Sequence, residues 1–191
     1  MGTELIRRGL DLSLPLWSGA INVTHPMEVS QVHEDYLSAG ADIITTNTFR
    51  TTPRTYIHAG YSKHEAKLRA RKSLFSAVEL AKNSAGEKCV VAGSIAPLED
   101  CYSPELFPGN AVAYEEYSVL IEWLVSAGVD IILFETMGCR DEIKTAMKAA
   151  SDIKFPLWLS LILRDEKTLL DGSGLSEILL ELKNYRIEIV L

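Results

Sequence analysis

The 191-residue sequence has few cysteines, a shortage of basic residues and no long apolar run. Its three cysteines, Cys89, Cys101 and Cys139, stand at wide and irregular spacing, which argues against a disulfide framework and favours a reducing, cytoplasmic compartment. The 26 aspartates and glutamates outnumber the 19 lysines and arginines, and a net charge of −7 speaks against nucleic acid as a partner. No stretch approaches the roughly 20 apolar residues that span a bilayer, and no signal peptide is recognisable at the N-terminus. We therefore expect a cytoplasmic protein that binds neither nucleic acid nor a membrane.

Several local motifs of known chemistry are also missing. There is no Cys-x-x-Cys pair, and the four histidines lack the spacing of a zinc protease, so local spacing predicts no metal site. Neither of the common glycine-rich phosphate-binding motifs occurs. The basic side chains between Lys63 and Lys72 are interpreted as a solvated helix face, because the chain as a whole is acidic.

A near repeat is the most informative feature that the sequence does contain. The segment Ser38–Ile44 (SAGADII) returns as Ser126–Ile132 (SAGVDII), 88 residues further along the chain. Each copy is typical of a helix end, a glycine in the left-handed conformation and an acidic residue that opens a buried strand. Such joins indicate a fold in which strands and helices alternate.

Apolar periodicity extends this pattern along the chain. Strands are expected over residues 42–47, 88–93, 130–134, 157–161 and 187–191, and helices over 24–39 (capped by Thr24), 62–83, 111–126, 141–150 and 175–183. The strands are almost continuously apolar, as in a parallel sheet covered by helices on both faces. We expect an α/β fold, namely an incomplete (β/α)₈ TIM barrel with strands 2 to 6, forming one partial domain over residues 1–191. The alternative on pattern alone is a doubly wound, flavodoxin-like sheet.

Polar residues at the carboxyl ends of these strands favour the barrel and are candidates for a site. Glu135 directly follows an apolar strand, and it fits a barrel-mouth carboxylate and a helix cap or structural ion pair equally well. Thr46 and Asn47 belong to a polar run at another strand end, which strand and turn propensities explain in part. Ser94 ends a third strand and is a weak signal by itself.

Two further segments are candidates for contacts with a ligand. The stretch 95–110 is long for a compact domain, which is typical of a lid or binding loop, with an insertion of no consequence as the alternative. Trp17 lies in a turn, where it either lines a pocket or serves as a half-buried structural residue.

Taken together, these residues resemble the homocysteine S-methyltransferase family, zinc-dependent (β/α)₈ enzymes that include S-methylmethionine- and betaine-dependent members. The matching segments occur in the family's order: MGTEL (1–5), LPLWS (14–18), AGADIITTNTF (39–49), GSIAP (93–97) and GVD through FET (128–136). The resemblance implies methyl transfer from a sulfonium donor, S-methylmethionine or S-adenosylmethionine, to homocysteine, which gives methionine. The substrate-binding residues that it implies are Glu135, Thr46, Asn47, Trp17, Phe49 and Ser94. Among them, Glu135 would hold the homocysteine amino group, Thr46 would contact homocysteine, and the two aromatic residues would line the pocket.

The sequence also departs from the family in two respects, the zinc-binding cysteines and the first strand. The family activates the homocysteine sulfur on Zn²⁺ held by three cysteine thiolates, and none of the three cysteines here stands at a ligand position. The family's first strand would also precede Met1. We therefore expect no metal ligand in this chain and no activity of the chain alone. The alternatives are an incomplete gene model and a non-catalytic homologue that binds a partner, or a full-length copy, through exposed barrel edges.

Overall fold

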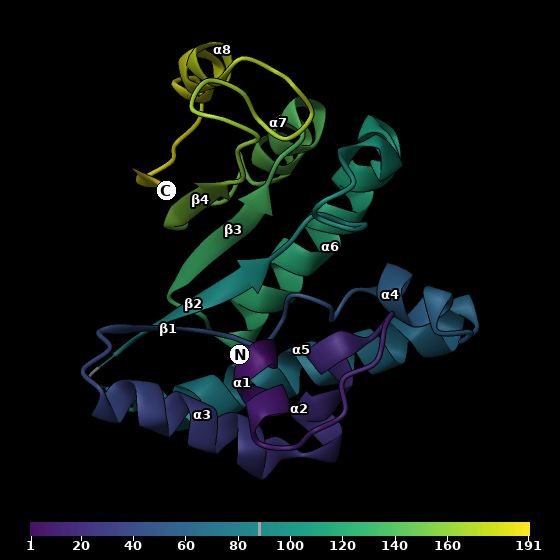
Figure 1. Ribbon diagram of the computed structural model, residues 1–191, viewed down its shortest axis with the longest axis vertical. Helices are drawn as coiled ribbons and strands as arrows, with labels where there is room; N and C mark the ends of the chain where they lie inside the picture. Colours follow the sequence, from purple (N-terminus) through teal and green to yellow (C-terminus); the bar gives the residue numbers. More distant parts are fainter. Residues whose placement is uncertain (88) are drawn as a thin grey trace. The chain divides into compact units, whose positions relative to one another are not determined.

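The computed structural model describes residues 1–87 and 89–191, which form two compact units. Unit 1 comprises Met1–Ser94 and Trp123–Asp130, and unit 2 comprises Ile95–Glu122 and Ile131–Leu191. The helix α6 (Asn110–Ala127) contributes its first part to unit 2 and its last part to unit 1. Figure 1 labels the elements along the chain. The single partial domain expected over residues 1–191 stays a prediction.

Unit 1 combines two parallel strands with helices that pack against them. The strand β1 (Ile43–Thr45) pairs with β2 (Val90–Ile95), and Ile44 lies opposite Val91. The helices α3 (Pro26–Ser38) and α5 (Lys63–Ala85) pack against each other and both contact β1 (Figure 1). The shorter helices of this unit are α1 (Gly2–Arg7), η1 (Trp17–Ala20), α2 (Ile21–Thr24) and α4 (Pro53–His58).

The repeated segments form the joins that the sequence predicts. Gly40 and Gly128 take positive φ angles of 96° and 89°, which is the left-handed conformation that commonly ends a helix. The carboxylate of Asp130 then accepts a hydrogen bond from the Val91 N–H at 2.8 Å and lies 3.3 Å from the ammonium of Lys82. This acidic residue therefore ties the second copy of the repeated segment to β2 and α5.

Unit 2 contains three parallel strands in chain order. The strand β4 (Leu157–Leu161) pairs with β3 (Ile131–Met137) on one side and with β5 (Ile189–Val190) on the other. The helices of this unit, besides the first part of α6, are η2 (Pro104–Leu106), α7 (Arg140–Ala149) and α8 (Leu175–Leu182). The fully buried rings of Tyr117 and Phe134 meet edge to face, with their centres 5.9 Å apart.

Most of the predicted elements are confirmed, with shifts at their ends. The helix predicted from Thr24 begins at Pro26, and His25 is its N-cap residue. Thr24 is instead the last residue of α2, where its hydroxyl donates a hydrogen bond to the Ala20 carbonyl. The predicted cap is therefore wrong, because a proline fits the first helical position and moves the start beyond Thr24. Of the strand predicted over residues 88–93, Lys88 lies outside the described residues. Within the described part of the chain, no helix is long and apolar enough to cross a membrane.

Candidate functional site

Glu135 lies at a bulge in β3. Phe134 lies opposite Leu159 and Met137 lies opposite Leu161, so β3 has one residue more than β4 over this interval. Phe134 and Met137 are both fully buried although they are three residues apart, a spacing that a regular strand would place on opposite faces. The bulge thus keeps both apolar side chains in the core and leaves the half-buried Glu135 and Thr136 between them.

Thr136 is the extra residue of the bulge, and its backbone adopts a left-handed conformation. Its φ angle is 57°, which is rare for a β-branched residue because the branched side chain crowds its own backbone. The Thr136 hydroxyl donates a hydrogen bond of 2.7 Å to the Glu135 carbonyl, which helps to hold the bulge. Backbone conformations of this kind are concentrated at functional sites. The sequence predicted that the strand ends at Phe134, whereas the bulge carries it on to Met137.

Thr46, Thr48 and Ser94 form a closed hydrogen-bond circuit in unit 1. The Ser94 N–H donates to the Thr46 hydroxyl at 3.1 Å, and the Thr48 hydroxyl donates to the Ser94 carbonyl at 2.7 Å. The two threonine hydroxyls are 2.7 Å apart, and Thr46 is the donor of this pair because the Thr48 proton is already used. All three residues are buried. The circuit joins the carboxyl ends of β1 and β2, and it leaves Thr46 with a free lone pair but no spare proton.

The side chain of Asn47 is used entirely within the protein. Its amide nitrogen donates to the Ser18 carbonyl at 2.9 Å and to the Asn22 side-chain oxygen at 2.8 Å, and its own oxygen accepts from the Ser18 hydroxyl at 2.7 Å. Asn22 in turn donates to the Asn47 carbonyl at 2.9 Å and to the Ser73 hydroxyl at 3.0 Å. This buried network fastens η1 to the end of β1. Sequence reasoning missed Ser18, Asn22 and Ser73, because no local pattern links residues so far apart in the chain.

The two aromatic candidates are both half-buried. Trp17 begins η1 with a φ angle of 48°, and its indole packs so closely on Gly2 that no Cβ would fit there. Trp17 also packs against the hydrophobic cluster that contains Leu5. The guanidinium carbon of Arg50 lies 5.6 Å from the centre of the Phe49 ring.

Five of the six predicted site residues therefore belong to unit 1, and Glu135 belongs to unit 2. Thr46 and Ser94 share one circuit, and Asn47 fastens the segment that follows Trp17. Contacts of these residues with a substrate stay a prediction. The structure adds Thr48, Asn22 and Thr136 as residues that fix the positions of the predicted ones.

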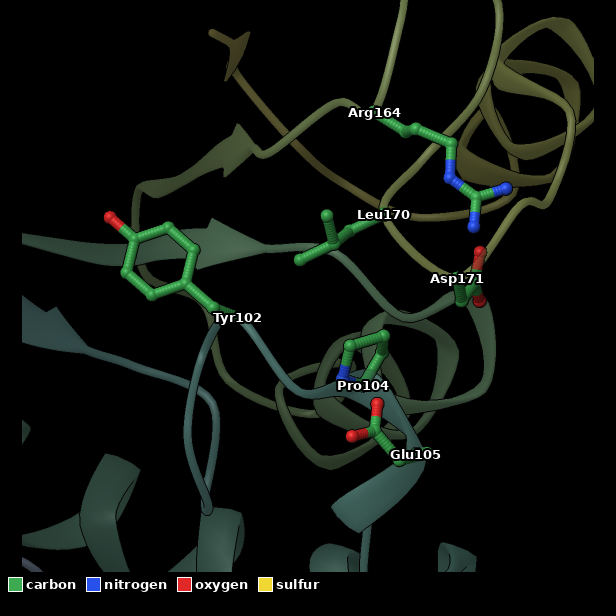
Figure 2. Close-up of a pocket in the computed structure, with 6 residues that line it drawn as sticks. All are labelled: Tyr102, Pro104, Glu105, Arg164, Leu170 and Asp171. Atoms are coloured by element: carbon green, nitrogen blue, oxygen red, sulfur yellow. The ribbon is translucent and has the colours of Figure 1, made fainter.

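Unit 2 also contains an open cavity of about 490 Å³. Its lining residues, drawn in Figure 2, are Tyr102, Pro104, Glu105, Arg164, Leu170 and Asp171. They come from two loops, one over residues 96–109 and one over residues 162–174. The first of these lies within the stretch that the sequence singled out as a binding loop. The second loop, over residues 162–174, contains no sequence pattern that predicts a site.

The three cysteines are half-buried and form no disulfide among the described residues. Cys89 belongs to unit 1, while Cys101 and Cys139 belong to unit 2. Burial raises the pKa of the Cys89 and Cys139 thiols. Among residues 1–87 and 89–191, no three His, Cys, Asp or Glu side chains are grouped so that they would hold a metal ion. The described residues thus do not fit a three-thiolate zinc site.

Parallel strands that alternate with helices define an α/β protein, and proteins of this class commonly build their small-molecule sites at the carboxyl ends of the strands. The family model described as "Homocysteine S-methyltransferase" matches residues 1–191, and the chain belongs to this family. Homocysteine S-methyltransferase 2 of Arabidopsis thaliana is 30% identical, over 93% of this chain and 61% of the relative. Homocysteine S-methyltransferase of Escherichia coli K12 is 29% identical, over 97% of this chain and 64% of the relative.

The solved structures agree with these sequence relatives. The metallated form of the homocysteine methyltransferase MmuM from Escherichia coli superposes with a TM-score of 0.88 at 27% identity, over 99% of this chain and 71% of that one. The predicted fold class, an α/β fold with the parallel strands of an incomplete barrel, is thereby confirmed. The chain spans less than two thirds of the length of the curated relatives named above.

Proposed function

We propose that residues 1–191 form the homocysteine-binding part of a homocysteine S-methyltransferase. The whole enzyme transfers a methyl group from a sulfonium donor, S-methylmethionine or S-adenosylmethionine, to homocysteine and thus serves methionine biosynthesis. The observation that carries this proposal is the placement of Glu135 at the strained bulge of β3, in a chain whose whole length matches the family.

Glu135 is the residue that recognises the amino group of homocysteine in this proposal. A half-buried carboxylate pairs strongly with an ammonium group. The two groups gain a charge-assisted hydrogen bond, and each keeps part of its hydration. The left-handed Thr136 fixes the backbone of Glu135 and so reduces the entropy that binding costs. Thr136 is therefore a positioning residue.

The residues of unit 1 supply the remaining contacts. Thr46, held by its circuit with Ser94, offers an oxygen lone pair to a donor on the substrate. The half-buried residues Trp17 and Phe49 would meet the apolar part of homocysteine. Asn47 acts indirectly, since its amide fastens the segment that follows Trp17.

The sulfur chemistry requires more than these residues provide. A free thiol has a pKa near 8.5 and is a weak nucleophile until it loses its proton. Zn²⁺ is the cofactor that the family resemblance implies for this step, but the described cysteines do not fit it. We therefore expect that the 191-residue chain binds homocysteine and does not convert it to methionine. A cytoplasmic location stays a prediction from the sequence.

Calorimetric titration with homocysteine tests the proposed binding. The unmodified chain is expected to bind, and Glu135→Gln is expected to weaken the affinity by about 10- to 100-fold, the effect of losing a charged hydrogen bond. Glu79→Gln, the same change on the exposed surface of α5, is the matched control and leaves the affinity unchanged. Absence of homocysteine binding by the unmodified, folded chain would refute the proposal.

A further inference from the structure

The charge of the chain is unevenly distributed along its length. Residues 50–72 contain seven lysines and arginines and a single acidic residue, Glu65, whereas the other residues contain 25 acidic and 12 basic side chains. Most of this basic segment lies in α4 and at the start of α5, two helices that pack against each other (Figure 1). The net charge of the whole chain thus hides a strongly basic segment.

Three cations of this segment, Lys63, Lys67 and Arg71, form a basic row along α5. They are four residues apart, which places them on one face of the helix, and all three are exposed. None of them has an ion-pair partner among residues 1–87 and 89–191. Like charges at this spacing repel each other, and cations near the start of a helix oppose its dipole. A partner of negative charge would remove this repulsion.

The neighbouring side chains do not neutralise the basic row. The carboxylate of Glu65 accepts hydrogen bonds from the Ser62 N–H and hydroxyl at 3.2 and 2.7 Å, so it is used in the cap of α5. The guanidinium carbon of Arg71 lies 4.2 Å from the centre of the Phe75 ring, a contact that orients the cation without cancelling its charge. Leu68, 57% exposed, lies beside the row and one turn before Arg71. This face of α5 therefore offers both positive charge and an apolar contact, the two components of a protein interface.

An acidic row of similar length, Glu115 and Glu122, lies on α6. The two residues are seven apart on one face of the helix, and both are exposed. In the part of the chain that the structure describes, neither has an ion-pair partner. Seven residues correspond to about 10 Å along a helix, and the eight residues from Lys63 to Arg71 to about 12 Å. Val112, 42% exposed, adds an apolar side chain one turn before Glu115.

We propose that the basic row on α5 of one copy of this chain docks on the acidic row on α6 of a second copy. Lys63 and Arg71 pair with the two glutamates, and Leu68 supplies an apolar contact beside them. A second copy brings two carboxylates at the spacing of the basic row, whereas a nucleic acid would bring its phosphates close to the acidic remainder of the chain. Exposed ion pairs are individually weak and are screened by salt, so the association is weak and depends on ionic strength.

Sedimentation velocity of the 191-residue chain at about 0.05 M and about 0.5 M salt tests the proposal. The unmodified chain is expected to associate at low salt, and its dissociation constant is expected to rise about 10-fold or more at high salt. The double variants Lys63→Glu/Arg71→Glu and Glu115→Lys/Glu122→Lys are each expected to lose the association at low salt. An equal mixture of the two variants is expected to regain it, because each reversed row then meets a row of opposite charge.

A control and a milder variant keep this test decisive. Lys183→Glu/Arg186→Glu makes the same change of net charge at exposed positions of unit 2 and is expected to associate like the unmodified chain. Circular dichroism verifies that each variant is folded, which we expect of Lys63→Glu because glutamate suits the first turn of a helix. If a reversed variant does not fold, Lys63→Gln/Arg71→Gln is expected to show an intermediate loss of association.

Three results would overturn the proposal. The first is an unmodified chain that stays monomeric at low salt. The second is association that both reversed variants retain, or that their mixture does not regain, because the contact would then use another surface, such as the edge of β5. The third is a monomeric chain that binds single-stranded polyuridylate and loses this binding in Lys63→Glu/Arg71→Glu, which would assign the basic row to a nucleic acid.

Discussion

His33 makes the stability of unit 1 depend on pH in a direction that the structure determines. The residue lies on α3 with 2% of its surface exposed, and its Nε2 has no hydrogen-bond partner among the described residues. Burial, with a smaller contribution from the positive charge of the N-terminal amino group, lowers the pKa of His33 from 6.5 to about 4. The folded chain therefore keeps this imidazole neutral at pH values at which the unfolded chain already binds a proton.

The sign and the size of the effect follow from this difference. As the pH falls below 6.5, the unfolded state gains a proton that the folded state does not take up until about pH 4, so the free energy of unfolding decreases throughout this window. Between pH 7.5 and pH 5 the linkage corresponds to a loss of about 2 kcal/mol. Above pH 7.5 His33 contributes almost no pH dependence.

Urea unfolding at pH 7.5 and pH 5, followed by circular dichroism, measures this loss. In His33→Leu, the decrease in the free energy of unfolding between the two pH values is expected to be about 2 kcal/mol smaller than in the unmodified chain. Because both proteins are measured at the same two pH values, the contributions of all other groups cancel. His64→Leu, on the exposed surface of α5, is the matched control and leaves the decrease in place. If His33→Leu and the unmodified chain lose the same free energy of unfolding, the reasoning about this buried imidazole is wrong.

Three further predictions concern the core, the metal and the strand edges. Glu142→Leu removes the buried acceptor of the Leu98 N–H and the Tyr117 hydroxyl, so urea unfolding should show a loss of about 2 kcal/mol or more, and an unchanged stability would contradict the assigned contacts. Glu122→Leu on the exposed surface of α6 is its control. Elemental analysis after incubation with Zn²⁺ and gel filtration should find far less than one zinc per chain, and one tightly held zinc per chain would show that the cysteines do assemble a site. The exposed apolar side chains of Ile189, Val190 and Leu191 predict that the chain associates with itself through a strand edge. Sedimentation velocity at increasing protein concentration would detect this association, and a chain that stays monomeric would contradict the prediction.

Short-range patterns in the sequence were sufficient to predict most of the fold. Gly40 and Gly128 adopt the left-handed conformation that their repeated context indicates, and a strand follows each of them. Apolar runs predicted β4 over residues 157–161 without error. These features depend on neighbouring residues alone, so the sequence contains all the information that they need.

Features that depend on distant contacts were not predictable. The bulge at Thr136 is the clearest example, because threonine favours strands and disfavours a positive φ angle, and only the pairing with β4 reveals the extra residue. Asn47 was predicted as a substrate-binding residue from its motif. Its amide is satisfied by Ser18 and Asn22, which are 29 and 25 residues away in the chain. Hydrogen-bond partners at such separations leave no periodic signal in a single sequence.

A comparison of two ligands on two proteins tests most directly whether Glu135 recognises the homocysteine amino group. The ligands are homocysteine and 4-sulfanylbutanoate, which lacks that amino group, and the proteins are the unmodified chain and Glu135→Gln, with dissociation constants measured by calorimetry. Homocysteine is expected to bind the unmodified chain about 10- to 100-fold more tightly than 4-sulfanylbutanoate does, and Glu135→Gln is expected to remove most of this preference. An equal preference for homocysteine in both proteins would show that Glu135 does not recognise the amino group, which would then be bound elsewhere.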